Sequence, residues 1–231
     1  MKQKWPERNK KKHMTKVFNI SGVSLSASSS NSTYKERDDS AIITIQKGNT
    51  LSGRFTNNKF KAAPVKLALN HLSQSSGDKT IFIINSGNAN AGTGARGDKD
   101  VMNCCMKVAK LNGINTQNVI PFSTGVIGKY LDSKRYLAAF NRASKNPNQS
   151  DWKKVAKSIL TTDTKPKLIS KKVLIGKEPL YITGIAKGSG MIRPDFATLL
   201  SFVFTDAQVP RNLLNKTHRE ALEASYERMT V

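Results

Sequence analysis

A threonine with the chemistry of a self-generated nucleophile follows a glycine-rich, proline-containing segment near the end of the chain. The segment runs from Lys187 to Ala197 and reads KGSGMIRPDFA, and Thr198 begins an apolar run directly after it. If the Ala197–Thr198 bond is cut, Thr198 acquires a free α-amine beside its hydroxyl. An unperturbed α-amine has a pKa of about 7.7–8.0, so it can accept the hydroxyl proton near neutral pH. The pattern therefore predicts an acyl-transfer centre contained in one residue.

Thr124 and Gly125 have the chemistry of an oxyanion hole. They follow a short apolar run, so a hydroxyl and a backbone N–H would come together at the end of a strand. Glycine lets a reacting group approach closely, and one oxyanion donor typically contributes about 2.7–4 kcal/mol to the transition state. Thr-Gly turns are common, and a single lysine is ordinarily a surface charge. The position of Lys187, eleven residues before Thr198, still makes it a candidate for binding a substrate carboxylate.

The segment Gly92–Gly97 matches the G-x-G-x-x-G pattern of dinucleotide-binding turns. In such sites the glycines lie at the strand–helix turn, and an acidic residue follows about 20 residues later. Here seven residues separate Gly92 from Ile84, the last residue of the predicted strand, and the later positions hold Gln117 and Asn118. The spacing argues against a dinucleotide cofactor and favours a substrate-cradling loop of backbone amides and asparagine side chains.

The strands and helices that must position these residues alternate along the chain. The predicted strands cover residues 41–46, 80–84, 119–122, 168–175, 180–185 and 199–204. The predicted helices cover residues 65–72, 98–112, 133–144, 150–160 and 211–229. Residues 21–39 are expected to form turns between short strands. Strands and helices joined by glycine-rich connections are typical of a mixed α/β domain.

The charge of the chain raises a different class of function. Its 231 residues include 38 lysines and arginines against 16 aspartates and glutamates, a formal net charge of +22. Such a surplus suits nucleic acid or an acidic membrane. Most basic residues are scattered through ordinary predicted helices and loops, however, and no recognised nucleic-acid-binding motif is present. We therefore expect no nucleic acid or membrane partner, with a salt-sensitive nucleic-acid-binding protein as the alternative.

Cysteine and histidine usage bears on compartment and metal binding. Cys104 and Cys105 are neighbours in a predicted helix, which suits a reducing, cytoplasmic compartment. His13, His71 and His218 share no metal-ligand spacing, so we expect no metal. The apolar runs are too short to span a bilayer.

Five segments, in order along the chain, resemble the ornithine acetyltransferases, also called glutamate N-acetyltransferases, of the cyclic arginine pathway. They read FTNNKFKAAPV, NSGNANAGTG, FSTGVIG, ILTTDTKPK and KGSGMIRPDFATLLSFVFTDA. The resemblance extends from about Ser21 to Val231. It implies a mixed α/β domain of the ornithine acetyltransferase type and a self-cleaving N-terminal-nucleophile enzyme. Residues 1–13 would be a basic disordered tail, with Met14 as an alternative start, 14–197 the α-chain part of the catalytic domain, and 198–231 the start of the β chain.

The resemblance also implies a role for each candidate residue. Autocatalytic cleavage would occur between Ala197 and Thr198, and Thr198 would be the nucleophile. The oxyanion-hole pair would be Thr124 and Gly125, and the substrate would be bound by Thr161, Lys187 and Thr198. The acetyl group would pass from N-acetylornithine to Thr198 and then to glutamate in a ping-pong cycle. Some relatives also use acetyl-CoA as a donor. The resemblance implies no metal or redox cofactor, and a heterotetramer of two α and two β chains.

Two features depart from the family pattern. Gly92 stands where the family usually has cysteine, and the chain ends at Val231 whereas relatives continue and supply further substrate-binding residues. The second departure predicts a C-terminally truncated catalytic domain. Two alternatives follow: a related N-terminal-nucleophile amidohydrolase or aminopeptidase, in which water replaces glutamate, and an inactive truncated remnant.

Overall fold

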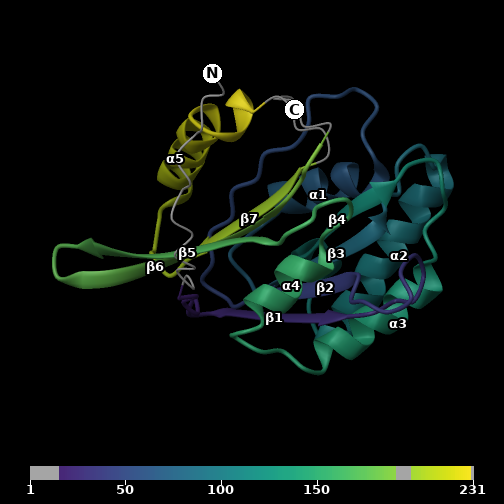
Figure 1. Cartoon of the computed structure of the whole chain (residues 1–231), viewed down its shortest axis with the longest axis horizontal. Coiled ribbons are helices and arrows are strands. Elements are labelled where there is room, and N and C mark those ends of the chain that lie inside the picture. Colours follow the sequence, from purple (N-terminus) through teal and green to yellow (C-terminus); the bar gives the residue numbers. More distant parts are fainter. Residues whose placement is uncertain (1–15, 191–198, 230–231) are drawn as a thin grey trace, which may run out of the picture.

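Two β-sheets organise the chain in its computed structural model, which describes residues 16–190 and 199–229 (Figure 1). The first sheet has the order β1-β2-β3-β4 and consists of β1 (Val23–Ser28), β2 (Ser40–Ile45), β3 (Thr80–Asn88) and β4 (Val119–Val126). Its first three strands pair antiparallel, whereas β3 and β4 are parallel. The second, antiparallel sheet consists of β5 (Lys167–Ile175), β6 (Glu178–Lys187) and β7 (Leu200–Thr205). The mixed α/β class predicted from the sequence is confirmed.

Both faces of the first sheet are covered. On one face, Ile42 and Ile83 pack in a cluster with residues of α1 (Ala63–Ser73), α2 (Gly94–Asn112) and α3 (Ser133–Ser144). On the other face, Ile43 and Ile84 join a cluster with α4 (Trp152–Ser158) and the second sheet. Successive strand residues point to opposite faces, so a strand buried on both sides has a continuous apolar run. This explains the sequence AIITI of β2, in which every residue is buried.

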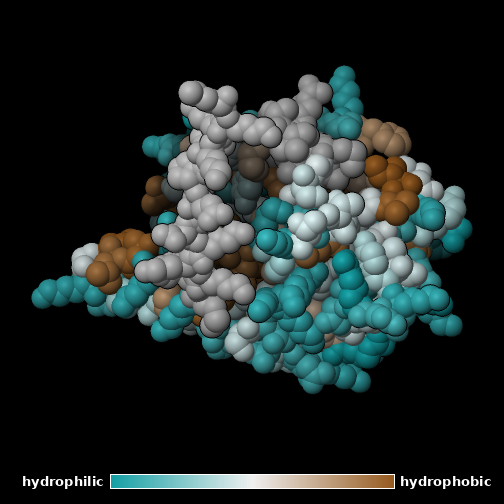
Figure 2. All heavy atoms as spheres, in the orientation of Figure 1, coloured by the Kyte–Doolittle hydropathy of each residue, from teal (hydrophilic) through white to brown (hydrophobic). Residues whose placement is uncertain are grey.

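Among the described residues, the second sheet packs into the core through one face. Ile185, Phe202 and Phe204 belong to the core shared with the first sheet, while Ile169 and Val203 on the opposite face are 58% and 65% exposed. The β5–β6 hairpin projects from the body in Figure 1, and hydrophobic residues (brown) lie beside hydrophilic ones (teal) near its end in Figure 2. Helix α5 (Arg211–Glu223) and the short 3₁₀ helix at Tyr226–Arg228 follow β7. The buried C-terminal end of β6 thus meets the first sheet, whereas its N-terminal end, in the hairpin, extends away from it.

The observed elements differ from the predicted ones mainly where strands extend into polar sequence. Strand β3 continues through Asn88 and β4 through Val126, because residues 85–87 pair in register with residues 123–125. The polar segment 85–88 was expected to be loop, and that expectation is wrong. Residues 21–39, which were predicted to form turns between short strands, contain the strand β1. The last helix ends at Glu223 instead of residue 229, and α2 begins at Gly94 instead of residue 98.

Candidate active site

A buried lysine ammonium joins three parts of the fold. Lys187 is the last residue of β6 and only 2% exposed. Its Nζ donates a hydrogen bond to Thr124 Oγ1 in β4 and another to Thr161 Oγ1 just beyond α4, both at 2.8 Å. Three of the residues selected from the sequence therefore meet at one point. Ala197 and Thr198, the two residues of the expected cleavage site, lie outside the described residues.

The direction of these hydrogen bonds determines what the threonines can do. An ammonium group has three donors and no acceptor, so each hydroxyl oxygen accepts a hydrogen bond from Lys187 through a lone pair. Each hydroxyl keeps its own hydrogen for another acceptor. A neighbouring positive charge strengthens such a donor. The arrangement thus presents two polarised hydroxyl donors, of which the one on Thr124 is 6% exposed.

Gly125 occupies a position that only glycine fits. Its φ is +134°, and an added Cβ would collide with the backbone of Gly87 and Asn88 in the paired strand. Gly125 pairs with Gly87 in the extended part of the parallel β3–β4 ladder. Thr124 and Gly125 are consecutive residues near the end of β4, where the two strands approach closely.

Side-chain hydrogen bonds hold this extended ladder together. Ser123 Oγ donates to Asn85 Oδ1 at 2.6 Å, and Asn85 Nδ2 donates to the Asn88 carbonyl at 2.7 Å. Tyr136 in α3 donates its hydroxyl to the Ser86 carbonyl at 2.9 Å. Satisfied buried polar networks make a local structure rigid. The sequence predicts a loop whose asparagine side chains face a substrate. The Asn85 side chain instead bonds to the Asn88 carbonyl and to Ser123 within the ladder.

The G-x-G-x-x-G pattern has a packing explanation. Asn90 Nδ2 donates to the Gly97 carbonyl at 3.0 Å, and Thr93 Oγ1 donates to Asn90 Oδ1 at 2.8 Å. An added Cβ at Gly97 would collide with the Thr93 side chain. Gly94 and Gly97 both belong to the first turns of α2. Gly97 therefore allows close packing at the start of α2, whereas Gly92 and Gly94 have positive φ values of +69° and +57°. These local requirements account for the motif without a dinucleotide.

Two residues near the site were not selected from the sequence. Arg37 Nη2 donates to the carbonyl of Leu160, the residue before Thr161, and its guanidinium lies over the ring of Tyr34. Asp163 accepts the backbone N–H of Gly188 at 2.8 Å. In the sequence, Asp163 could have been selected only because it lies two residues after Thr161 in the ILTTDTKPK segment. Arg37 has no such neighbour, since it is more than a hundred residues before Thr161 in the chain.

Charge and burial act in opposite directions on Lys187. Burial lowers the pKa of its ammonium because water no longer solvates the charge, and the positive charge of Lys167 lowers it further. The negative charge of Asp163 raises the pKa of Lys187, but the net direction is downward. Both threonine partners are uncharged. Asp163 is therefore the group that favours the charged form of Lys187.

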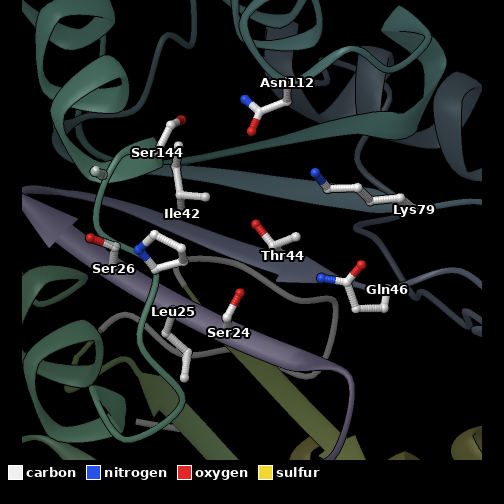
Figure 3. A pocket seen from close by; sticks show the side chains of 11 residues that line it. Ser24, Leu25, Ser26, Ile42, Thr44, Gln46, Lys79, Asn112 and Ser144 are labelled. Carbon is white, nitrogen blue, oxygen red and sulfur yellow. The ribbon is translucent and has the colours of Figure 1, made fainter.

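Several other features lie away from this site. Cys104 and Cys105 are buried and free, and burial is the main factor that raises the pKa of Cys104 to about 12. A cavity of about 130 Å³ lies beside β1 and β2, with Ser26, Thr44 and Asn112 among its lining residues (Figure 3). The described residues contain no group of three or more His, Cys, Asp and Glu side chains placed to hold a metal. Across the same two ranges, no helix combines the length and apolarity needed to span a membrane.

Comparison with known proteins gives a consistent result along almost the whole chain. The ArgJ family matches residues 26–231. The arginine biosynthesis bifunctional protein ArgJ of Psychrobacter arcticus is 41% identical over 215 residues, covering 93% of this chain and 52% of the relative. The protein of the same name from Methylococcus capsulatus is 41% identical over 212 residues, covering 92% of this chain and 51% of the relative. The chain spans about half the length of these curated relatives.

Two solved structures share the fold. The arginine biosynthesis bifunctional protein argJ of Bacillus halodurans has a TM-score of 0.69 and 29% identity, covering 75% of this chain and 90% of that chain. The ornithine acetyltransferase of Mycobacterium tuberculosis, complexed with ornithine, has a TM-score of 0.69 and 27% identity, covering 78% of this chain and 94% of that chain. Both therefore resemble the present chain over most of its described length.

Proposed function

This chain belongs to the ArgJ family, and from that membership we propose that it carries the nucleophile and oxyanion hole of an acetyltransferase of arginine biosynthesis. The acetyl group would pass from N-acetylornithine to glutamate through Thr198. The observation that carries the proposal is the Lys187 ammonium, which holds the hydroxyls of Thr124 and Thr161 at 2.8 Å. This arrangement supplies the hydroxyl half of the proposed oxyanion hole and orients its hydrogen away from Lys187.

The first proposed step is cleavage of the Ala197–Thr198 peptide bond. The Thr198 hydroxyl oxygen attacks the Ala197 carbonyl carbon, and an ester forms as the amide C–N bond breaks and the nitrogen takes up the proton. Water then hydrolyses this ester to the Ala197 carboxylate and restores the hydroxyl. The α-amine released on Thr198 becomes the base for that hydroxyl. The negative oxygen that develops during attack on the Ala197 carbonyl needs hydrogen-bond donors. Under this proposal Thr124 and Gly125 provide them.

The second step is acetyl transfer. The Thr198 oxygen attacks the acetyl carbon of N-acetylornithine, and the hydroxyl proton moves to the α-amine. The tetrahedral oxyanion accepts hydrogen bonds from the Thr124 hydroxyl and the Gly125 N–H. Collapse breaks the amide C–N bond, the α-amine returns the proton to the departing nitrogen, and ornithine leaves an acetyl ester on Thr198. Attack by the glutamate amine then gives N-acetylglutamate and restores the hydroxyl.

Under this proposal Thr161 and Lys187 contribute to substrate binding in different ways. Lys187 is buried, so it acts through the hydroxyls it holds instead of reaching out as an exposed cation. Thr161, which is half-buried, is the one that offers its hydroxyl hydrogen to the substrate. We also propose that no metal or redox cofactor takes part and that two α and two β chains assemble. The buried free cysteines fit a cytoplasmic location.

Intact-mass measurement tests the cleavage step. The expressed chain should yield two polypeptides that separate between Ala197 and Thr198, and Thr198→Ala should remain one polypeptide. Ser189→Ala is the matched control, because it removes an exposed hydroxyl from the same glycine-rich segment and should leave cleavage intact. Continued splitting of Thr198→Ala at this bond would refute the proposal.

Product analysis tests the transfer step. Ornithine release from N-acetylornithine should depend on glutamate and should yield an equal amount of N-acetylglutamate. Release at the same rate without glutamate would instead identify the amidohydrolase alternative, in which water is the acceptor.

A further inference from the structure

Asp163 is a buried carboxylate for which the proposed chemistry has so far given no role. Its side chain is only 1% exposed. Aspartate is almost never fully buried unless it is paired, because burial removes the water that stabilises its charge. Asp163 lies between Thr161, which binds Lys187, and Lys167, the first residue of β5. Its burial therefore calls for an explanation in terms of its partners.

One oxygen of the carboxylate is tied to the segment that contains the cleavage site. Asp163 Oδ1 accepts the backbone N–H of Gly188 at 2.8 Å and pairs with Lys167 Nζ at 2.5 Å. Gly188 follows Lys187 directly and begins the residues leading to Thr198. The hydrogen bond thus fixes the peptide at which β6 ends and this segment begins. Asp163 Oδ2 has no hydrogen-bond partner within the described part of the chain.

The carboxylate also acts on Lys187 itself. Within residues 16–190 and 199–229, the Lys187 ammonium donates to two uncharged hydroxyls. Among the charged groups of these residues, Asp163 favours the charged form of Lys187 and Lys167 opposes it. Burial by itself would raise the pKa of Asp163, but the hydrogen bonds from Lys167 and Gly188 and the two lysine charges lower it below its usual value. Asp163 therefore stays negative wherever Lys187 needs a counter-charge.

We propose that Asp163 is a positioning residue for this site: it holds the Gly188 peptide and supplies the counter-charge of the Lys187 ammonium, which in turn orients the threonine hydroxyls. The inference rests on the proposed function, because it assigns Asp163 a part in cleavage and transfer through Lys187. Its two actions have different physical bases. Anchoring Gly188 needs only an acceptor, whereas holding Lys187 charged needs the negative charge.

The variant Asp163→Asn separates the two actions. It keeps the volume and one acceptor oxygen for Gly188 and removes the charge. We expect the pKa of Lys187, followed by NMR of ¹³C-labelled lysine and assigned with Lys187→Met, to fall relative to wild type. We also expect cleavage at Ala197–Thr198 to slow about tenfold at neutral pH, less than the about 10²–10³-fold effect of deleting an oxyanion donor. Lowering the pH should reprotonate Lys187 and narrow the difference between variant and wild type.

Lys167→Gln is the matched control. It removes the other charged partner of the same carboxylate, and the Lys167 side chain is 50% exposed. Cleavage in this variant should stay within twofold of wild type, and the pKa of Lys187 should not fall. Asp163→Ser, also neutral, replaces Asp163→Asn if circular dichroism shows that the asparagine variant does not fold.

The two readouts distinguish this inference from the proposed function. A wild-type chain that does not split refutes the proposed function, while the lysine titration still tests the action of Asp163 on Lys187. An unchanged Lys187 pKa in the neutral variants overturns the inference. So does cleavage of Asp163→Asn at the wild-type rate across the pH range.

Discussion

The Nζ atom of Lys187 and the Oγ1 atom of Thr124 lie 2.8 Å apart although their strands belong to different sheets. This hydrogen bond joins the end of β6 to the end of β4. Thr161 shares the same ammonium from a third position in the chain. The site is therefore built at a junction, and any change that separates the two sheets would separate its donors.

Loss of the Lys187 ammonium should disable the site without unfolding the protein. Lys187→Met keeps an unbranched side chain but removes both hydrogen bonds and the charge. We expect cleavage at Ala197–Thr198 to slow by about 10²–10³-fold, because the hydroxyl donor of the proposed oxyanion hole is no longer polarised or held. Mass spectrometry over time would measure it. Lys171→Met, at an exposed position of β5, should cleave normally; equal slowing in both variants would contradict the prediction.

Gly125→Ala should destabilise the fold through backbone strain and collision. A residue with a Cβ is strained at φ +134° and would collide with Gly87 and Asn88. We expect the free energy of unfolding to fall by about 3 kcal/mol, since strain and overpacking each typically cost about 1–3 kcal/mol. Urea unfolding measures this loss. Gly176→Ala has a positive φ but open space around it, so it should cost only about 1–2 kcal/mol. A similar loss at both glycines would show that collision contributes nothing.

The two cysteines should be unreactive in the folded protein. Burial raises the pKa of Cys104 to about 12, and it raises the pKa of Cys105 as well. The thiolate is the nucleophile, so its population at pH 8 is very small. Iodoacetamide should therefore leave the mass of the native chain unchanged and add two groups after denaturation. Rapid alkylation of the native chain would show that α2 opens readily.

Asp163 should make stability fall on the acid side. Its pKa is lowered in the folded state, so the unfolded chain binds the proton first as pH decreases. The stabilisation is fully present above the unfolded pKa of about 3.9 and is lost as pH falls through the lower folded value. The difference in unfolding free energy between wild type and Asp163→Asn should therefore be constant near neutral pH and shrink below about pH 4. Urea titrations at several pH values would measure it.

An exposed carboxylate provides the comparison for that titration. Asp98 pairs with Lys66 at the surface, and its side chain is 45% exposed. Asp98→Asn should change stability little at any pH, because exposed ion pairs contribute only about 0–1 kcal/mol. An acid-side dependence equal to that of Asp163→Asn would mean that burial is not its cause.

The sequence by itself was enough to predict the bounds of those helices and strands whose residue patterns are local. Helix α3 has the predicted bounds, Ser133–Ser144, because its apolar residues repeat with helical spacing and Asp132 accepts the N–H of Arg135 at its start. Strands β2 and β5 were also found within one residue at each end, since β-branched runs are a local signal. The resemblance of five segments to one family, and through it the choice of Thr124, Thr161 and Lys187, needed only the order of residues along the chain.

Tertiary structure alone decided how these residues act. The polar ends of β3 and β4 become strand because they pair with each other, and neither segment has a local reason to be extended. Lys187 looked like a surface charge or a carboxylate ligand, but it is buried between two hydroxyls. The role proposed for Asp163 depends on its contact with Gly188 and on its charge interaction with Lys187, neither of which the sequence shows. Hydrogen bonds and charge interactions depend on distance in space, and residues far apart in the chain come within that distance only when the sheets pack together.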